Sequence, residues 1–183
     1  MKAIGILLLG AVIASPAAAD VKASSAAGFE VESRTIVGAS PAEAYAMLVR
    51  IGDWWDSAHT YSGNSANMSL EAEAGGCFCE SLPKGGGTVE HMRVVYAQPG
   101  VMLRLQGGLG PLQAEAISGT LTWVLKAVPG GTEITQTYIV GGYVRGGAAK
   151  LAPLVDQVLR QQLSGLERRL LKPRPKRRDS PEL

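Results

Sequence analysis

Apolar and polar residues alternate along several short segments of this chain, a period that is typical of β-strands with one buried face. The first segment covers residues 29–37, in which Phe29 and Val31 alternate with glutamates. Six more follow the middle of the chain, over residues 68–72, 77–82, 88–97, 102–106, 113–127 and 132–140. Short glycine and proline breaks separate them, so the pattern predicts an antiparallel meander of hairpins.

Two other segments repeat their apolar residues at a helical period. The first opens on Ser40-Pro41-Ala42-Glu43, a capping box in which Ser40 and Glu43 satisfy free amides at the helix start. Gly52 is expected to end this helix. The second segment lies near the C-terminal end, and one of its faces is formed by Leu151, Val155, Val158, Gln162, Leu166 and Leu170.

The C-terminal helix should be long enough to cover a sheet. About 18 residues would span about 27 Å; Pro153 fits only in the first turn, and Asp156 and Arg160 have the spacing of an ion pair on the opposite side. The order strand, helix, six strands, long helix predicts an α+β fold. A twisted sheet wrapped around one helix does not close tightly everywhere, so we expect an apolar cavity between them.

This order of elements resembles the helix-grip fold of the START/Bet v 1-like superfamily (SRPBCC), in which a curved antiparallel sheet wraps around a long C-terminal helix. The resemblance covers residues 29–171 and rests on ASPAEAY (39–45), IGDWW (51–55), GGCFCE (75–80), VVYAQPG (94–100) and GGTEIT (130–135). It implies the fold and a cavity for an apolar ligand. It implies no particular reaction, because members bind lipids, sterols and plant metabolites, cyclise polyketides, or assist chaperones.

Residues 1–19 have the features of an export signal. Lys2 precedes an apolar run over residues 3–13, and small residues then give an A-x-A pattern before Asp20. The run is too short to span a membrane. We therefore expect a periplasmic or secreted protein in which residues 20–28 form a flexible segment before the domain at 29–171. This location argues against assistance to a cytoplasmic chaperone.

The positive charge of the chain is concentrated in its tail. Residues 172–183 contain five basic and two acidic residues, are rich in proline and lack an apolar face, which predicts disorder. Weak contact with an anionic surface is one expectation for this tail. Nucleic acid is not an expected partner of an exported protein, and stable membrane insertion is not expected either.

Candidate ligand-binding residues cluster directly after the first helix. The segment GDWWDSAHTY (52–61) places large rings beside polar groups, which is typical of the lip of a pocket, although Trp54 and Trp55 are also compatible with core anchors. His91 shares a predicted strand face with Val89, Arg93 and Val95. The complete set of candidates is Trp54, Trp55, His59, Tyr61, His91, Trp123, Tyr138 and Tyr143.

Cys77 and Cys79 are the only cysteines and share one face of a predicted strand. Their Cα atoms would be about 6.6 Å apart, at the outer limit of disulfide geometry, and an oxidising compartment favours pairing. The alternatives are unpaired packing thiols, or a zinc site that also uses His59 and His91. The spacing is tight for zinc ligands and nothing brings the histidines near, so no metal or other cofactor is expected.

Support for catalysis is weak. The sequence has no Gly-x-Ser-x-Gly elbow and no phosphate-binding loop. His59 could act as a base oriented by Asp56, Tyr138 is a second candidate, and Arg145 in the glycine-rich loop 141–147 could hold an anion, although a hinge is the simpler interpretation. The main hypothesis is an exported protein that binds an apolar or amphipathic small molecule. The alternatives are a cyclase-like or hydrolytic enzyme and a structural module without ligand.

Overall fold

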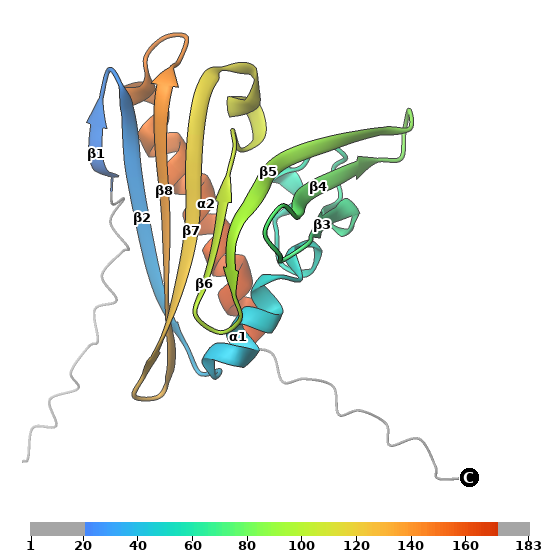
Figure 1. The fold of residues 1–183 in the computed structure, drawn as a ribbon, viewed down its shortest axis with the longest axis vertical. Helices are drawn as coiled ribbons and strands as arrows, with labels where there is room; N and C mark the ends of the chain where they lie inside the picture. The colour runs from blue at the N-terminus through green and yellow to red at the C-terminus, as the bar shows by residue number, and fades with distance from the viewer. Residues whose placement is uncertain (1–20, 172–183) are drawn as a thin grey trace, which may run out of the picture.

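The computed structural model describes residues 21–171 as an eight-stranded antiparallel sheet with two α-helices (Figure 1). The strand order is β1-β2-β8-β7-β6-β5-β4-β3. The strands are β1 (Val21–Ser25), β2 (Gly28–Val37), β3 (Met68–Leu70), β4 (Cys77–Leu82), β5 (Gly87–Gln98), β6 (Met102–Gln106), β7 (Ala116–Val128) and β8 (Gly131–Tyr143). The helices are α1 (Pro41–Leu48) and α2 (Ala148–Leu171). The predicted α+β helix-grip fold is confirmed. The expected export signal at 1–19 and the basic tail at 172–183 lie outside the described residues.

The boundaries of three elements differ from the prediction. The segment 20–28 was expected to be flexible but contains β1, because the edge of β2 offers free backbone groups whose pairing needs no apolar pattern. Helix α1 keeps its capping box but ends at Leu48, and a 3₁₀ turn (Ile51–Asp53) follows before Trp54. The start of the expected strand at 113–127 belongs instead to a 3₁₀ helix, Gly110–Ala114.

Helix α2 crosses behind the sheet in Figure 1 and differs from its prediction in two ways. It has 24 residues rather than about 18, so Pro153 lies in the second turn. Asp156 was expected on the outer side but is only 1% exposed, with its Oδ2 3.1 Å from Arg160 Nε. The helix is therefore rotated about its axis relative to the expected apolar face. Neither α-helix within residues 21–171 has the length and apolarity needed to cross a membrane.

The loop that follows α1 is fixed against α2. A Cβ atom at Gly165 would lie 2.4 Å from the Trp54 carbonyl oxygen, so only glycine permits this approach. The Asp56 amide donates to the buried Gln162 Oε1 at 2.8 Å. These contacts hold the loop after α1 beside the second half of α2 and so position the site.

Candidate functional site

A pocket with a volume of about 500 Å³ lies between α2, the loop after α1 and one end of the sheet. Most of its wall is apolar. Helix α2 and the segment before β7 contribute Leu109, Pro111, Leu112, Leu151, Leu154, Val155, Val158 and Leu159. Side chains with polar groups complete the wall at Trp55, His59, Thr60, Tyr61, His91, Glu115, Tyr138 and Arg145. Leu154 is 59% exposed and lies at the rim.

Five of the eight candidate ligand-binding residues line this pocket: Trp55, His59, Tyr61, His91 and Tyr138. The other three do not, and their assignment is corrected. Trp54 is a core anchor whose indole donates to the Leu48 carbonyl at 3.0 Å and whose ring meets Trp123 edge-on. Trp123 is fully buried and donates to Gln136 at 2.9 Å. Tyr143 is 70% exposed and lies outside the pocket wall.

The structure does not pair His59 with Asp56 as a base and its orienting acid. Asp56 caps a short 3₁₀ helix by accepting from the Ala58 amide, and this hydrogen bond is the main reason why its pKa is lowered. The second carboxylate oxygen of Asp56 accepts from the Gln161 amide group, and His59 Nε2 lies 3.3 Å from Gln161 Oε1. Gln161 is thus the neighbour that His59 and Asp56 share.

The Tyr138 hydroxyl both donates and accepts a hydrogen bond within the protein. Its oxygen donates to the Gly107 carbonyl and accepts from the Leu109 amide, each at 3.2 Å. Burial raises the pKa of its phenol to about 12. Proton transfer at neutral pH is therefore unfavourable, and Tyr138 serves to fix the segment that enters the pocket at Leu109.

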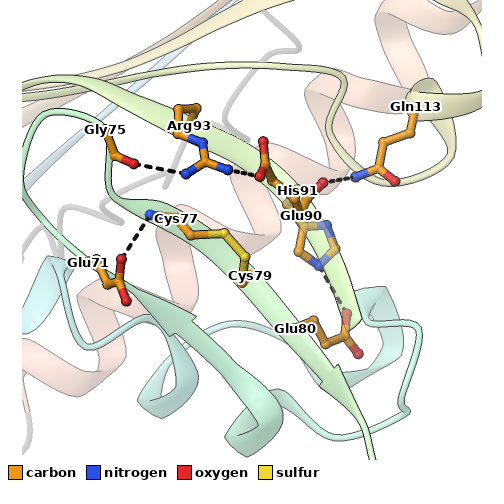
Figure 2. The surroundings of a disulfide bond; sticks show 9 residues. All are labelled: Glu71, Gly75, Cys77, Cys79, Glu80, Glu90, His91, Arg93 and Gln113. Carbon is orange, nitrogen blue, oxygen red and sulfur yellow. Dashed lines mark hydrogen bonds and ion pairs between the residues drawn. A yellow bond between two sulfur atoms is a disulfide. The ribbon is translucent and has the colours of Figure 1, made fainter. Parts of the chain in front are cut away.

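The acid–histidine pair of this site is Glu80 with His91, on β4 and β5 (Figure 2). His91 Nε2 lies 3.0 Å from Glu80 Oε2, and the side chains are 2% and 0% exposed. Tyr61 stacks on the His91 ring with a centroid distance of 5.9 Å, and Phe78 packs against it at 5.0 Å. The imidazole is therefore held in both position and orientation.

Hydrogen bonds keep Glu80 ionised despite its burial. Burial alone would raise its pKa, but hydrogen bonds from Ser62, the Tyr61 amide and His91 together lower it. Burial lowers the pKa of His91 more than the carboxylate raises it. A carboxylate only accepts hydrogen bonds, so the proton of the neutral imidazole is assigned to Nε2 and Nδ1 carries the lone pair.

A β-bulge turns His91 inward. The register pairs Phe78 with Met92 but Cys79 with Glu90, so His91 is the extra residue on β5. His91 and Met92 are consequently both buried, as bulges re-aim side chains. The prediction that His91 shares a face with Arg93 and Val95 is wrong, because strict alternation fails at the bulge and both residues are exposed, whereas Val89 is half-buried.

The structure joins Cys77 and Cys79 by a disulfide next to this bulge (Figure 2). Their Cα atoms are 5.4 Å apart, closer than the roughly 6.6 Å of a regular strand, so β4 is locally shortened opposite the extra residue of β5. The bond also removes both thiolates from the suggested zinc set. Within residues 21–171, no three His, Cys, Asp or Glu side chains are grouped so that they could hold a metal ion.

Arg145 closes one side of the pocket by binding Glu115. The Arg145 Nε and backbone amide donate to the two carboxylate oxygens at 3.0 and 2.9 Å. These hydrogen bonds lower the pKa of Glu115 and raise that of Arg145. The guanidinium expected to hold an anion is thus engaged within the protein, where it ties the loop after β8 to the segment before β7.

Sequence reasoning missed Glu80 and most of the apolar wall. Glu80 follows Phe78 by two residues, so a charged side chain at an inward strand position was the available signal. The pocket-lining residues before β7 gave no comparable signal, because apolar and polar residues do not alternate at a regular period in this loop.

No protein-family model and no curated protein matches this chain, but solved structures resemble it. Protein MLL2253 from Mesorhizobium loti has a TM-score of 0.55 at 18% identity, covering 78% of this chain and 96% of that one. The Aha1 dimer from Colwellia psychrerythraea has a TM-score of 0.53 at 17% identity, covering 77% and 95%. DynU16 from the dynemicin biosynthetic locus has a TM-score of 0.54 at 16% identity, covering 77% of this chain and 46% of DynU16. At these identities the likeness concerns the fold alone, and it fits a Bet v 1-like fold.

Proposed function

We propose that this protein binds an apolar or amphipathic small molecule in the pocket between α2 and the sheet. The composition of the wall carries the proposal: apolar side chains from α2 and from Leu109, Pro111 and Leu112 line a space of about 500 Å³. This volume lies within the range of about 300–1,000 Å³ that is typical of small-molecule sites. Protein interiors are otherwise densely packed, so a space of this kind favours an occupant.

Burial of apolar surface supplies most of the binding free energy, at about 25 cal/mol per Å² removed from water. The few polar side chains then set the orientation of the ligand. The two sequence-based catalytic candidates give little support to an enzymatic role, because Asp56 accepts from Ala58, His59 lies beside Gln161 and Tyr138 donates to Gly107.

We also propose that the chain is a START/Bet v 1-like protein that acts in the periplasm or outside the cell. The signal at 1–19 and the Cys77–Cys79 disulfide support this location, because disulfides persist in oxidising compartments. Contact of the basic tail with an anionic surface remains a weaker part of the same proposal.

A charge placed in the pocket wall tests the binding proposal. Val158 is half-buried and lines the pocket, whereas the neighbouring Gln157 is exposed and does not. Val158→Asp should weaken binding of the neutral fluorescent probe N-phenyl-1-naphthylamine at least about tenfold, because an unpaired carboxylate beside an apolar ligand is strongly unfavourable. Gln157→Asp adds the same charge on the same helix and should change affinity less than about twofold.

The measurement is a fluorescence titration with each folded variant, compared by circular dichroism. If the wild-type protein does not bind the probe, or binds it equally well with Asp at position 158, the pocket is not the binding site.

A further inference from the structure

His91 Nδ1 is a buried polar atom without a hydrogen-bond partner in the pocket wall. Of the side-chain atoms found in this condition within residues 21–171, it is the one whose residue lines the pocket. A buried acceptor that gives up water without a replacement destabilises the fold. The arrangement therefore needs an explanation outside the protein's own hydrogen bonds.

Four other polar side chains of the wall, Thr60, Trp55, Tyr138 and Glu115, already make hydrogen bonds within the protein. The Thr60 hydroxyl donates to the Ser57 carbonyl at 2.8 Å, and Trp55 donates to the His59 carbonyl at 3.1 Å. Tyr138 uses its hydroxyl in both directions, and Glu115 accepts from Arg145. His91 Nδ1 thus stands out as the buried acceptor of a wall residue that is open to an occupant.

The geometry that surrounds His91 is built to hold this acceptor still. Glu80 fixes the tautomer by accepting from Nε2, and the Tyr61 and Ser62 amides fix the carboxylate in turn. Tyr61 stacks on the imidazole and Phe78 packs against it at a tilt, so the ring is held by its neighbours. Such support of a binding atom by surrounding hydrogen bonds and rings is typical of specificity groups in ligand sites.

We propose that the natural ligand is an amphipathic molecule with a hydroxyl or N–H donor, which donates a hydrogen bond to His91 Nδ1 while its apolar body contacts α2. This rests on the proposed function and adds the class of ligand: neutral alcohols, phenols or amides rather than carboxylates or pure hydrocarbons. A carboxylate has no proton to donate and would place its charge near Glu80, so the site disfavours it.

A matched pair of probes tests the donor. 4-Octylphenol and 4-octylanisole differ by the hydroxyl hydrogen, which a methyl group replaces in the anisole. The wild-type protein should bind the phenol about tenfold more tightly, as expected for one satisfied buried acceptor. Displacement of N-phenyl-1-naphthylamine measures both affinities in the same assay.

Two variants assign this preference to a residue. His91→Phe keeps a ring between Tyr61 and Phe78 but has no acceptor, so the phenol preference should fall to about onefold while the anisole still binds. Gln157→Ala changes an exposed residue of α2 outside the pocket wall and should keep the preference. A phenol preference that persists in His91→Phe, or that disappears in Gln157→Ala, overturns the assignment.

Failure of this inference is distinguishable from failure of the proposed function. If neither probe binds the wild-type protein, the pocket proposal fails; if both bind equally, only the donor class fails.

The wild-type protein also gives a readout that needs no His91 variant. The chain has two histidines, so ¹⁵N imidazole spectra can be assigned through His59→Gln. Nδ1 of His91 should be unprotonated and its signal should move upfield with 4-octylphenol but not with 4-octylanisole; a proton on Nδ1 overturns the proposal.

Discussion

At the residue scale, the charge state of His91 links the pocket to the stability of the fold. Its ring is buried against Phe78 and Tyr61, and burial outweighs the attraction of the Glu80 carboxylate, so the folded protein holds it neutral. Glu80 from β4 is the charged group that faces it, and Tyr61 from the loop after α1 supplies the stacked ring. Protonation of His91 is consequently unfavourable for the folded state.

The free energy of unfolding should therefore decrease as pH falls from about 7.5 to 5. The folded pKa of His91 lies below its ordinary value of 6.5, so the unfolded chain takes up this proton first. The contribution of neutral His91 to the free energy of unfolding is present above pH 6.5. It is lost as the pH falls towards the folded pKa, with a slope of at most about 1.4 kcal/mol per pH unit. The lowered pKa of Glu80 acts separately, below its ordinary value of 4.5.

Urea unfolding at pH 7.5 and 5.0 measures this effect. His91→Phe should flatten the dependence in this window. An equally steep dependence in His91→Phe would place the responsible group elsewhere.

At the element scale, the hairpin of β4 and β5 shapes the polar end of the pocket. The disulfide shortens β4 where β5 carries its extra residue, and Gln113 donates to the Glu90 carbonyl beside the bulge (Figure 2). On the outer face, Arg93 pairs with Glu90 and donates to the Gly75 carbonyl at 2.9 Å. Covalent and polar contacts thus hold the register on which the position of His91 depends.

Reduction of the disulfide should lower stability only modestly. The covalent loop is very short, so the loop-entropy model gives about 1–2 kcal/mol for Cys77–Cys79. Amide hydrogen exchange over residues 89–93 should become faster, because the bulge loses its constraint. Urea unfolding with and without a phosphine reductant measures the first effect, and exchange measures the second.

The double variant Cys77→Ser, Cys79→Ser is the matched control and should respond to reductant in neither measurement. Native protein should take up an alkylating agent only after reduction. Alkylation of both thiols in exported, unreduced protein would show that the bond does not form there.

At the scale of the whole molecule, one helix serves two surfaces. The buried side of α2 approaches the sheet and the loop after α1, and it includes Ala152, Asp156 and Gly165. Val155 and Val158 lie on the side of α2 that lines the pocket. Gln136 joins these layers by accepting from Trp123 and donating to the Leu159 carbonyl at 3.0 Å. The cavity is therefore bounded by the packing of the whole domain rather than by one loop.

The proposed export of the protein rests on the signal-like pattern of residues 1–19. We expect the exported form to begin at Asp20, after removal of residues 1–19. N-terminal sequencing of protein from the periplasm or medium checks this cut. Intact Met1 on a cytoplasmic product would contradict both export and the proposed site of action.

The sequence alone determined the order of the elements. Period-two alternation marked seven of the eight strands, the capping box at Ser40 and Glu43 marked the start of α1, and the helical period marked α2. These signals are local, since each depends on residues within one element. Together with the resemblance to helix-grip proteins, they were sufficient for the fold and for a pocket against the last helix.

Only the tertiary structure decided which side chains meet in that pocket. Trp54 and Trp55 are adjacent in sequence, yet one packs on Trp123 and the other faces the pocket. The acid–histidine pair is Glu80 with His91 rather than the expected Asp56 with His59. A bulge that shifts the register of β5 by one residue brings His91 to Glu80. Register shifts and the rotation of a helix about its axis are set by contacts between distant segments, and a local period contains no information about them.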